Sequence, residues 1–133
     1  MRSETSQPLV LVVDDYEDAR TICAEYLQFR GFRCATVGDG REALAKALEL
    51  LPDVILMDLA LPGLDGWEAT RELKRDERTR DIPVIAITAF DSKEIFLRAL
   101  EAGCIAVLAK PIAPRILEEE IRRILHQVGE VEP

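Results

Sequence analysis

Five residues with charged or hydroxyl side chains stand at the ends of short apolar runs in this 133-residue chain: Asp14, Asp15, Asp58, Thr88 and Lys110. If the three carboxylates lie close together, they repel one another and need positive charge, which one lysine and a divalent cation can supply. A ligand set of oxygen atoms without His or Cys favours a hard cation such as Mg²⁺. A carboxylate beside Mg²⁺, a hydroxyl group and an amine is equipped to accept a phosphoryl group as an aspartyl phosphate.

The apolar runs that precede these residues have the features of buried strands. Each run is short and continuous, which is typical of strands covered on both faces in a parallel sheet. One further run ends in a Gly-Asp-Gly turn. The predicted strands are Leu9 to Val13, Arg33 to Val37, Val54 to Met57, Val84 to Ile87 and Ile105 to Ala109.

Between the strands, apolar residues recur at helical spacing and predict five helices. In the third, Asp65 and Glu68 have the spacing of a capping box. The expected apolar stripe of the fourth consists of Ile95, Phe96, Ala99 and Leu100. The first helix is predicted from Glu17 to about Arg30, and the second ends before Pro52. The third begins at about Gly66, and the fourth ends at Gly103. The fifth begins at Pro114.

Five strands that alternate with five helices predict an α/β fold, a doubly wound parallel sheet with helices on both faces. In such sheets ligands bind outside the carboxyl ends of the strands, at the point where the strand order reverses. In the flavodoxin-like order 2-1-3-4-5 this point lies between strands one and three. Those two strands end in Asp14-Asp15 and in Asp58, so the carboxylates are expected at the ligand-binding edge.

Each of these residues alone has a simpler structural explanation. An aspartate at the end of a strand is more often a helix cap than a ligand. Thr88 alone is more often a strand residue, and Lys110 alone is more often a solvated side chain. The joint pattern favours a site, because all of the residues fall at strand ends in one predicted fold.

Length and composition indicate a single domain with an acidic surface. The net charge of −8 argues against binding to nucleic acid or to an anionic membrane through a basic surface. No apolar run has transmembrane length and no signal peptide is visible. The three cysteines lack metal-ligand spacing, so we expect buried, reduced thiols in a cytoplasmic protein. The predicted divisions are a disordered tail over residues 1–8, a domain over 9–128 and a C-terminal tail over 129–133.

At these positions the chain resembles the receiver domains of response regulators in two-component signalling. The resemblance extends from about Leu9 to about Val128. It rests on the pair Asp14-Asp15, the segment Met57-Asp58-Leu-Ala-Leu-Pro-Gly-Leu-Asp-Gly66, Thr88-Ala89 and Lys110-Pro111. Because the last predicted helix ends close to the end of the sequence, we expect a stand-alone receiver domain that is not itself an enzyme.

The resemblance implies a role for each residue of the site. Asp58 would accept a phosphoryl group from a histidine kinase or a histidine phosphotransfer protein. Asp15, Asp58 and the carbonyl group of Ala60 would bind Mg²⁺, and Asp14 would position the metal through water. Thr88 and Lys110 would contact the phosphoryl oxygens, and the peptide bond before Pro111 would be cis.

The resemblance also implies how the signal leaves the domain, and a departure from the family pattern at Val107 bears on this step. Phosphorylation would shift a conformational equilibrium and change the face formed by the fourth helix, fifth strand and fifth helix, which would bind a downstream protein. The family usually has an aromatic residue three positions before the lysine, and here that residue is Val107. We therefore expect more of the change in the loop from Ala89 to Lys93.

Two other function classes compete with this interpretation. A phosphatase of the dehalogenase-like class also uses an aspartate nucleophile and Mg²⁺, but it needs a second aspartate two positions later, where this chain has Ala60. The second alternative is a pure interaction module, which keeps the same fold but is never phosphorylated. The complete set of five polar residues argues against the interaction module.

Overall fold

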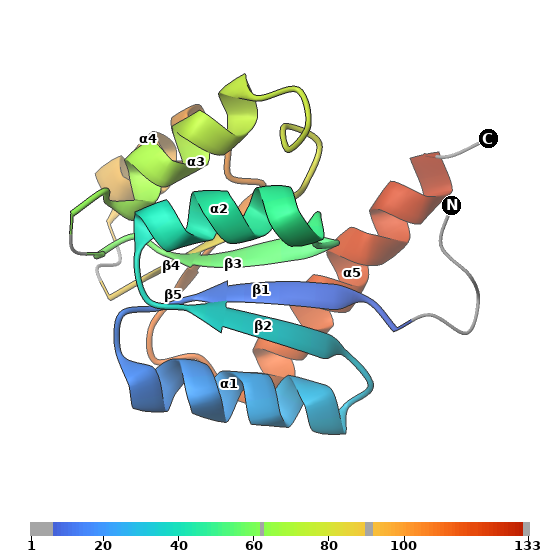
Figure 1. Cartoon of the computed structure of the whole chain (residues 1–133). Helices are drawn as coiled ribbons and strands as arrows, with labels where there is room; N and C mark the ends of the chain where they lie inside the picture. Colours follow the sequence, from blue (N-terminus) through green and yellow to red (C-terminus); the bar gives the residue numbers. More distant parts are fainter. Residues whose placement is uncertain (1–6, 62, 90–91, 132–133) are drawn as a thin grey trace.

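A computed structural model describes residues 7–61, 63–89 and 92–131, and these residues form one five-stranded sheet (Figure 1). All neighbouring strands are parallel and their order is β2-β1-β3-β4-β5, as predicted. The strands are β1 (Leu9–Val13), β2 (Arg33–Val37), β3 (Val54–Asp58), β4 (Val84–Thr88) and β5 (Ala106–Ala109). The order reverses between β1 and β3, so the predicted binding edge is present.

Helices cover both faces of the sheet. In Figure 1, α2, α3 and α4 lie on one side of the strands, and α1 and α5 lie on the other. This is the predicted doubly wound arrangement. The helices are α1 (Glu17–Phe29), α2 (Gly40–Leu50), α3 (Gly66–Arg75), α4 (Lys93–Ala102) and α5 (Pro114–Val131).

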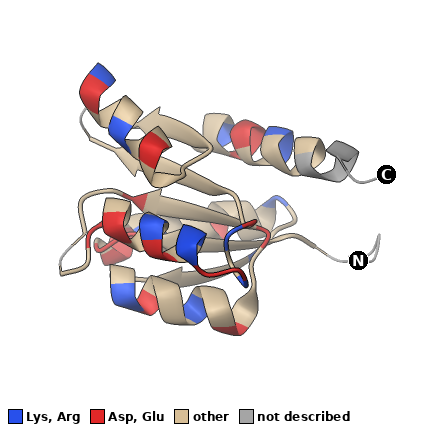
Figure 2. Cartoon of the chain, turned by 90° about the horizontal axis from the view of Figure 1, so that it is seen from above, with Lys and Arg blue, Asp and Glu red and all other residues tan. Residues whose placement is uncertain are grey.

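Alternation along the strands separates two hydrophobic cores. Leu11, Ile55 and Met57 point into the core beneath α2, α3 and α4. Val12 and Leu56 point into the core beneath α1 and α5. Because successive strand residues face opposite sides and both sides are covered, the central strands have to be apolar throughout. Charged residues lie mainly on helices and loops, as Figure 2 shows.

Two predicted helix ends are formed by the expected groups. The side chain of Asp65 accepts a hydrogen bond from the backbone N–H of Glu68 and caps α3. In a complete capping box the Glu68 carboxylate would accept a hydrogen bond from the backbone N–H of Asp65. Here this carboxylate forms ion pairs with Arg71 and Arg75. Gly103 ends α4 with φ of 115°, a conformation that glycine adopts without steric cost.

Other predictions about the elements need correction. In α4 the buried residues are Ala99 and Ala102, whereas Phe96 and Leu100 of the expected stripe are 44% and 38% exposed. Ile95 and Ala99 of the expected stripe pack against the core, whereas Phe96 and Leu100 project outward. Residues 129–131, predicted as tail, continue α5. Residues 1–6 of the predicted N-terminal tail lie outside the described residues.

The three cysteines are free thiols, but only Cys104 is fully buried. Cys23 and Cys34 are half-buried between α1 and β2. Burial raises the pKa of Cys23 to about 12 and that of Cys34 to about 11, so both remain protonated at neutral pH. Among the helices that the structure describes, none combines the length and hydropathy needed to cross a bilayer.

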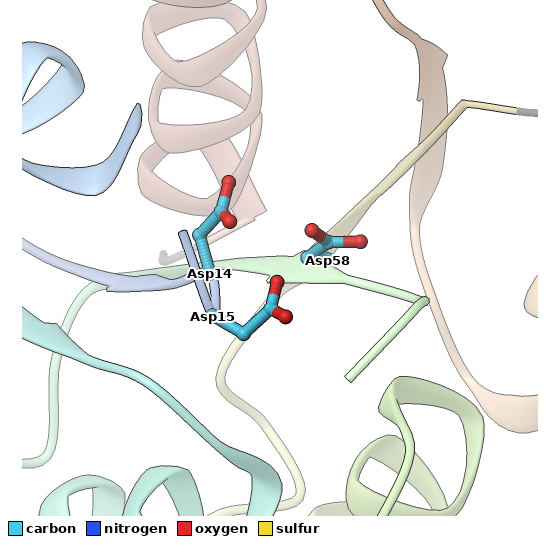
Figure 3. Close-up of side chains that lie close together, drawn as sticks. All are labelled: Asp14, Asp15 and Asp58. Carbon is cyan, nitrogen blue, oxygen red and sulfur yellow. The ribbon is translucent and has the colours of Figure 1, made fainter. Parts of the chain in front are cut away.

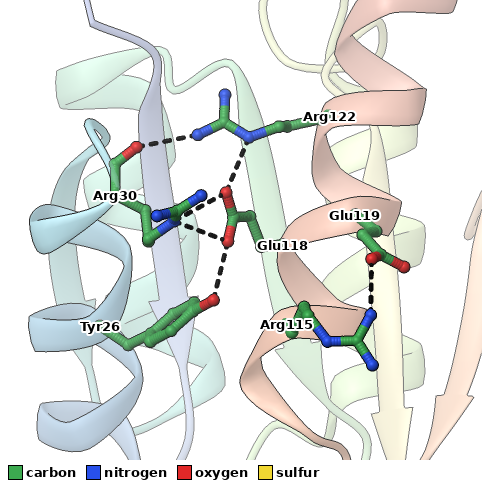
Figure 4. Close-up of polar contacts among 6 residues, drawn as sticks. All are labelled: Tyr26, Arg30, Arg115, Glu118, Glu119 and Arg122. Atoms are coloured by element: carbon green, nitrogen blue, oxygen red, sulfur yellow. Dashed lines mark hydrogen bonds and ion pairs between the residues drawn. The ribbon is translucent and has the colours of Figure 1, made fainter.

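One buried carboxylate joins α1 to α5 (Figure 4). Glu118 is 5% exposed and accepts hydrogen bonds from Tyr26 Oη at 2.8 Å, Arg30 Nε at 3.1 Å and Arg122 Nε at 2.9 Å. Arg122 also donates to the carbonyl oxygen of Arg30 and lies over the ring of Phe32. The hydrogen bond from Tyr26, together with those from Arg122 and Arg30, lowers the pKa of Glu118 from 4.5 to about 2, although burial opposes the shift.

Because the pKa of Glu118 is lowered in the folded state, its contribution to stability is complete above about pH 4.5 and is lost as the pH falls towards 2. We expect Glu118→Gln to lower the free energy of unfolding at pH 7 by about 2 kcal/mol, because it weakens charge-assisted hydrogen bonds. The difference from wild type should shrink between pH 5 and pH 2, as measured by urea denaturation. Glu119→Gln, which removes an exposed partner of Arg115, is the matched control and should have little effect. A pH-independent difference would contradict this account.

Candidate functional site

The three aspartates meet at the carboxyl edge of the sheet, where the strand order reverses (Figure 3). Val13 pairs with Met57 in the β1–β3 register, so the residues that follow them, Asp14 and Asp58, come side by side. One carboxylate oxygen each from Asp14, Asp15 and Asp58 lies within 4.8 Å of the others. Asp58 is buried, whereas Asp15 is exposed at the mouth of the cluster.

Lys110 reaches the cluster from the end of β5. Its backbone N–H donates to the carbonyl oxygen of Thr88 at 2.7 Å, and the Lys110–Pro111 peptide bond is cis, as the resemblance implied. Its ammonium nitrogen lies 3.0 Å from Oδ2 of Asp58 and 3.6 Å from Oδ2 of Asp14. The predicted lysine is therefore in direct contact with two of the three carboxylates.

Thr88 and Ala60 occupy neighbouring positions around Asp58. Asp58 pairs with Ile87 in the β3–β4 register, so Thr88 is the next residue along the adjacent strand, and it is 6% exposed. The backbone N–H of Ala60 donates to Oδ1 of Asp58 at 2.9 Å. The Ala60 N–H thus donates to one oxygen of the Asp58 carboxylate and the Lys110 ammonium group to the other.

The charges of the cluster do not balance. Burial raises the pKa of Asp58 and the Asp14 carboxylate adds to the rise, against the lowering effects of the Ala60 N–H and Lys110. Burial alone would lower the pKa of Lys110, but its contacts with Asp58 and Asp14 raise it. Three clustered carboxylates face a single ammonium group, so the site carries excess negative charge when all of these groups are ionised. The oxygen donors and the charge deficit fit a divalent cation.

A cavity of about 600 Å³ opens beside the carboxylates. This volume is within the range of small-molecule sites and leaves space next to Asp58 for a reacting group. The walls are mainly apolar and come from both the sheet and the helices α1 and α5. The lining includes Asp14, Asp58 and Lys110, together with Cys23, Leu56, Ile87, Ile112 and Leu117.

Two residues near the site were missed by sequence reasoning. A Cβ atom at Gly66 would lie 2.4 Å from the carbonyl oxygen of Asp58 and 2.7 Å from Cα of Leu59, so only glycine fits there. The sequence shows that Gly66 directly follows the cap residue of α3, but it does not show that the backbone at the end of β3 approaches this glycine. Arg20 of α1 donates to the carbonyl oxygen of Asp14 at 3.0 Å. No pattern in the sequence distinguishes this arginine from the other charged residues of α1.

Residues 10–122 match the family model of the response regulator receiver domain. The chain is also similar to the polar-differentiation response regulator DivK of Brucella ovis, with 42% identity over 110 residues that cover 82% of this chain and 89% of DivK. It is 37% identical over 120 residues to the phosphate regulon transcriptional regulatory protein PhoB of Pseudomonas aeruginosa. That match covers 90% of this chain but 52% of PhoB, so this chain spans about half of that relative.

A solved structure with the same fold contains a metal. It is the receiver domain of a sensor histidine kinase from Pseudomonas aeruginosa PAO1, with a magnesium ion coordinated in its active site cleft. The two structures superimpose with a TM-score of 0.84 and 35% sequence identity, covering 91% of this chain and 99% of that domain.

Proposed function

Because this chain belongs to the response regulator receiver domain family of two-component signalling, we propose that it is a phosphoacceptor whose Asp58 is phosphorylated in the presence of Mg²⁺. Receiver domains act as signalling modules rather than as enzymes with a substrate of their own. The donor would be a histidine kinase or a histidine phosphotransfer protein. The observation that carries the proposal is a buried carboxylate in contact with Lys110 at 3.0 Å and clustered with two further carboxylates.

In the proposed reaction an oxygen of the Asp58 carboxylate attacks phosphorus. The bond between phosphorus and the imidazole nitrogen of the donor breaks, and its electron pair stays on that nitrogen. Lys110 offsets the charge of the transferred group, and the hydroxyl group of Thr88 donates a hydrogen bond to a phosphoryl oxygen. Holding the carboxylate between the Ala60 N–H and Lys110 limits its rotation before the attack.

The metal site is assigned to Asp14, Asp15, Asp58 and the carbonyl oxygen of Ala60. The close carboxylates and the unbalanced negative charge support this assignment, since such oxygen ligands are those that Mg²⁺ prefers. When bound, Mg²⁺ neutralises charge on the carboxylates and on the transferring phosphoryl oxygens. Asp14 would orient the metal through water, and the exposed Asp15 would provide a ligand from the solvent side.

Phosphorylation by a small donor tests this proposal. We expect intact mass spectrometry to detect one phosphoryl adduct after incubation with acetyl phosphate and Mg²⁺, and hydroxylamine to remove it. Replacing Mg²⁺ with EDTA should slow its formation by about tenfold or more, because the cation offsets charge in the transition state. Equal rates with Mg²⁺ and with EDTA would contradict the metal assignment. A folded protein that gives no adduct with acetyl phosphate or with phosphohistidine donors would favour the unphosphorylated interaction module.

The output surface is proposed to be the face of α4, β5 and α5. Exposed apolar side chains on and beside α4 and β5 support docking of a downstream protein: Phe96, Leu97, Leu100 and Ile105. Val107 lies half-buried in β5 and has no ring that could swing inward, so we propose that more of the conformational change occurs between Ala89 and Lys93. Residues 90 and 91 of this segment lie outside the described residues. The net charge of −8 favours protein partners over nucleic acid or an anionic membrane. We propose a cytoplasmic location, because the phosphoryl groups of the proposed donors originate from ATP used by a histidine kinase.

A further inference from the structure

The backbone of Asp14 is held on two sides. Its N–H donates to the carbonyl oxygen of Val37 at 3.2 Å, which continues the pairing of β1 with β2 by one residue. Its carbonyl oxygen accepts a hydrogen bond from Nη1 of Arg20 at 3.0 Å. Arg20 is half-buried in α1, six residues along the chain, and spans the turn that carries both Asp14 and Asp15.

The position of the Arg20 guanidinium group depends on Gly38. A Cβ atom at residue 38 would lie 3.3 Å from Nη1 and 3.7 Å from Cζ of Arg20. Such a contact is tight enough to displace the guanidinium group by a few tenths of an ångström. The absence of a side chain at the end of β2 therefore lets Arg20 lie against the backbone while it donates to Asp14.

The side chain of Asp14 is oriented within the same turn. Its Oδ1 accepts a hydrogen bond from the backbone N–H of Tyr16 at 2.9 Å. Its Oδ2 lies 3.6 Å from the Lys110 ammonium nitrogen. With the N–H, the carbonyl oxygen and one carboxylate oxygen of Asp14 all engaged, the direction of the other carboxylate oxygen is set.

We propose that Arg20 is a positioning residue for the cation site, which fixes the turn so that the carboxylates of Asp14 and Asp15 point towards the metal. The inference rests on the proposed Mg²⁺ site and adds a residue that does not touch the metal. Two effects of the arginine oppose each other. Its positive charge repels Mg²⁺ and weakens binding, whereas its hydrogen bond removes backbone freedom that metal binding would otherwise have to restrict. The second effect dominates.

The two effects predict opposite changes in Mg²⁺ affinity when Arg20 is replaced, so the direction of the change distinguishes them. We expect Arg20→Gln to weaken Mg²⁺ binding about tenfold by isothermal titration calorimetry, at the lower end of the loss seen when groups that orient metal ligands are removed. If Arg20 acted only through its charge, the same variant would bind Mg²⁺ more tightly. Arg20→Lys keeps the charge and should also weaken binding, because the shorter lysine side chain places its ammonium nitrogen away from the position of Nη1, which donates to Asp14. Arg41→Gln removes an exposed positive charge at the start of α2 and is the control for net charge.

A second variant tests the same geometry while keeping Arg20. Gly38→Ala should weaken Mg²⁺ binding by about two- to threefold, a smaller effect because the guanidinium group is displaced rather than removed. Thermal unfolding without Mg²⁺ establishes which variants are folded, and if Arg20→Gln is not folded, Gly38→Ala decides. Unchanged or tighter binding in the folded variants would overturn the role of Arg20. If wild type does not bind Mg²⁺ at millimolar concentrations, the proposed metal site itself is wrong.

Discussion

Replacing Asp58 with Asn is expected to abolish phosphorylation, reducing the adduct formed with acetyl phosphate and Mg²⁺ to below about 1% of the wild-type amount, since an amide is a far weaker nucleophile than a carboxylate. The two side chains have nearly the same shape, and the amide oxygen can still accept a hydrogen bond from Lys110. Intact mass spectrometry over a time course measures the effect.

The stability of Asp58→Asn provides its own control. Because burial raises the pKa of Asp58, its ionised form is less favourable in the folded state than in the unfolded chain, and this loss of stability is present at pH 7. Without Mg²⁺ we therefore expect the variant to unfold at the same temperature as wild type or above it. Asp81→Asn changes an exposed aspartate before β4, at the opposite edge of the sheet, and should be phosphorylated normally. Wild-type adduct levels in Asp58→Asn would show that another group accepts the phosphoryl group.

Gly66→Ala is expected to lower the free energy of unfolding by about 3 kcal/mol, because the new methyl group would meet backbone atoms that cannot move independently. The contacts are the carbonyl oxygen of Asp58 at 2.4 Å and Cα of Leu59 at 2.7 Å. Relief of the overlap has to move α3 away from the end of β3, which also carries the proposed phosphoacceptor. We therefore expect slower phosphorylation of the fraction that remains folded. Urea denaturation and the acetyl phosphate time course measure the two effects.

Gly31→Ala separates steric overlap from backbone conformation. Gly31 has φ of 101°, and among the described residues no atom beyond its own chain neighbours lies within 4 Å of the place that a methyl group would take. Alanine there should therefore cost about 1 kcal/mol from conformation alone. Gly66 has the opposite properties, since its expected cost comes from contact with other atoms. Equal losses of stability in the two variants would contradict the packing argument for Gly66.

The strands and the convergence of the site could be predicted because both depend on local patterns and on one rule of topology. Continuous apolar runs identified β1, β3 and β4 to within a residue, since strands covered on both faces have no polar positions to interrupt them. Parallel connections bring the carboxyl ends of all strands to one edge. The polar residues at those ends, such as Asp14, Asp58 and Lys110, therefore had to lie near one another.

Features that depend on distant partners could not be predicted in this way. Glu118 belongs to a run of three glutamates that is typical of an exposed helix surface. It is nevertheless buried, because Tyr26 of α1 and Arg30 at the end of that helix face it from more than 80 residues away in the sequence. The exposure of Phe96 also depends on how its helix packs in the folded protein, which the local sequence does not show. Helical spacing marks an apolar face of α4, but the fully buried residues of this helix are the alanines Ala99 and Ala102.

The chemical location of the phosphoryl group tests the central claim most directly. An aspartyl phosphate is reduced by borohydride to homoserine, which gives a permanent mass change at the modified residue that peptide mass spectrometry can locate. After treatment with acetyl phosphate and Mg²⁺, the account predicts this change at Asp58 and at no other aspartate. Conversion at Asp14 or Asp15 instead, or a stable phosphoryl group on another type of side chain, would contradict the assignment of Asp58 as the phosphoacceptor.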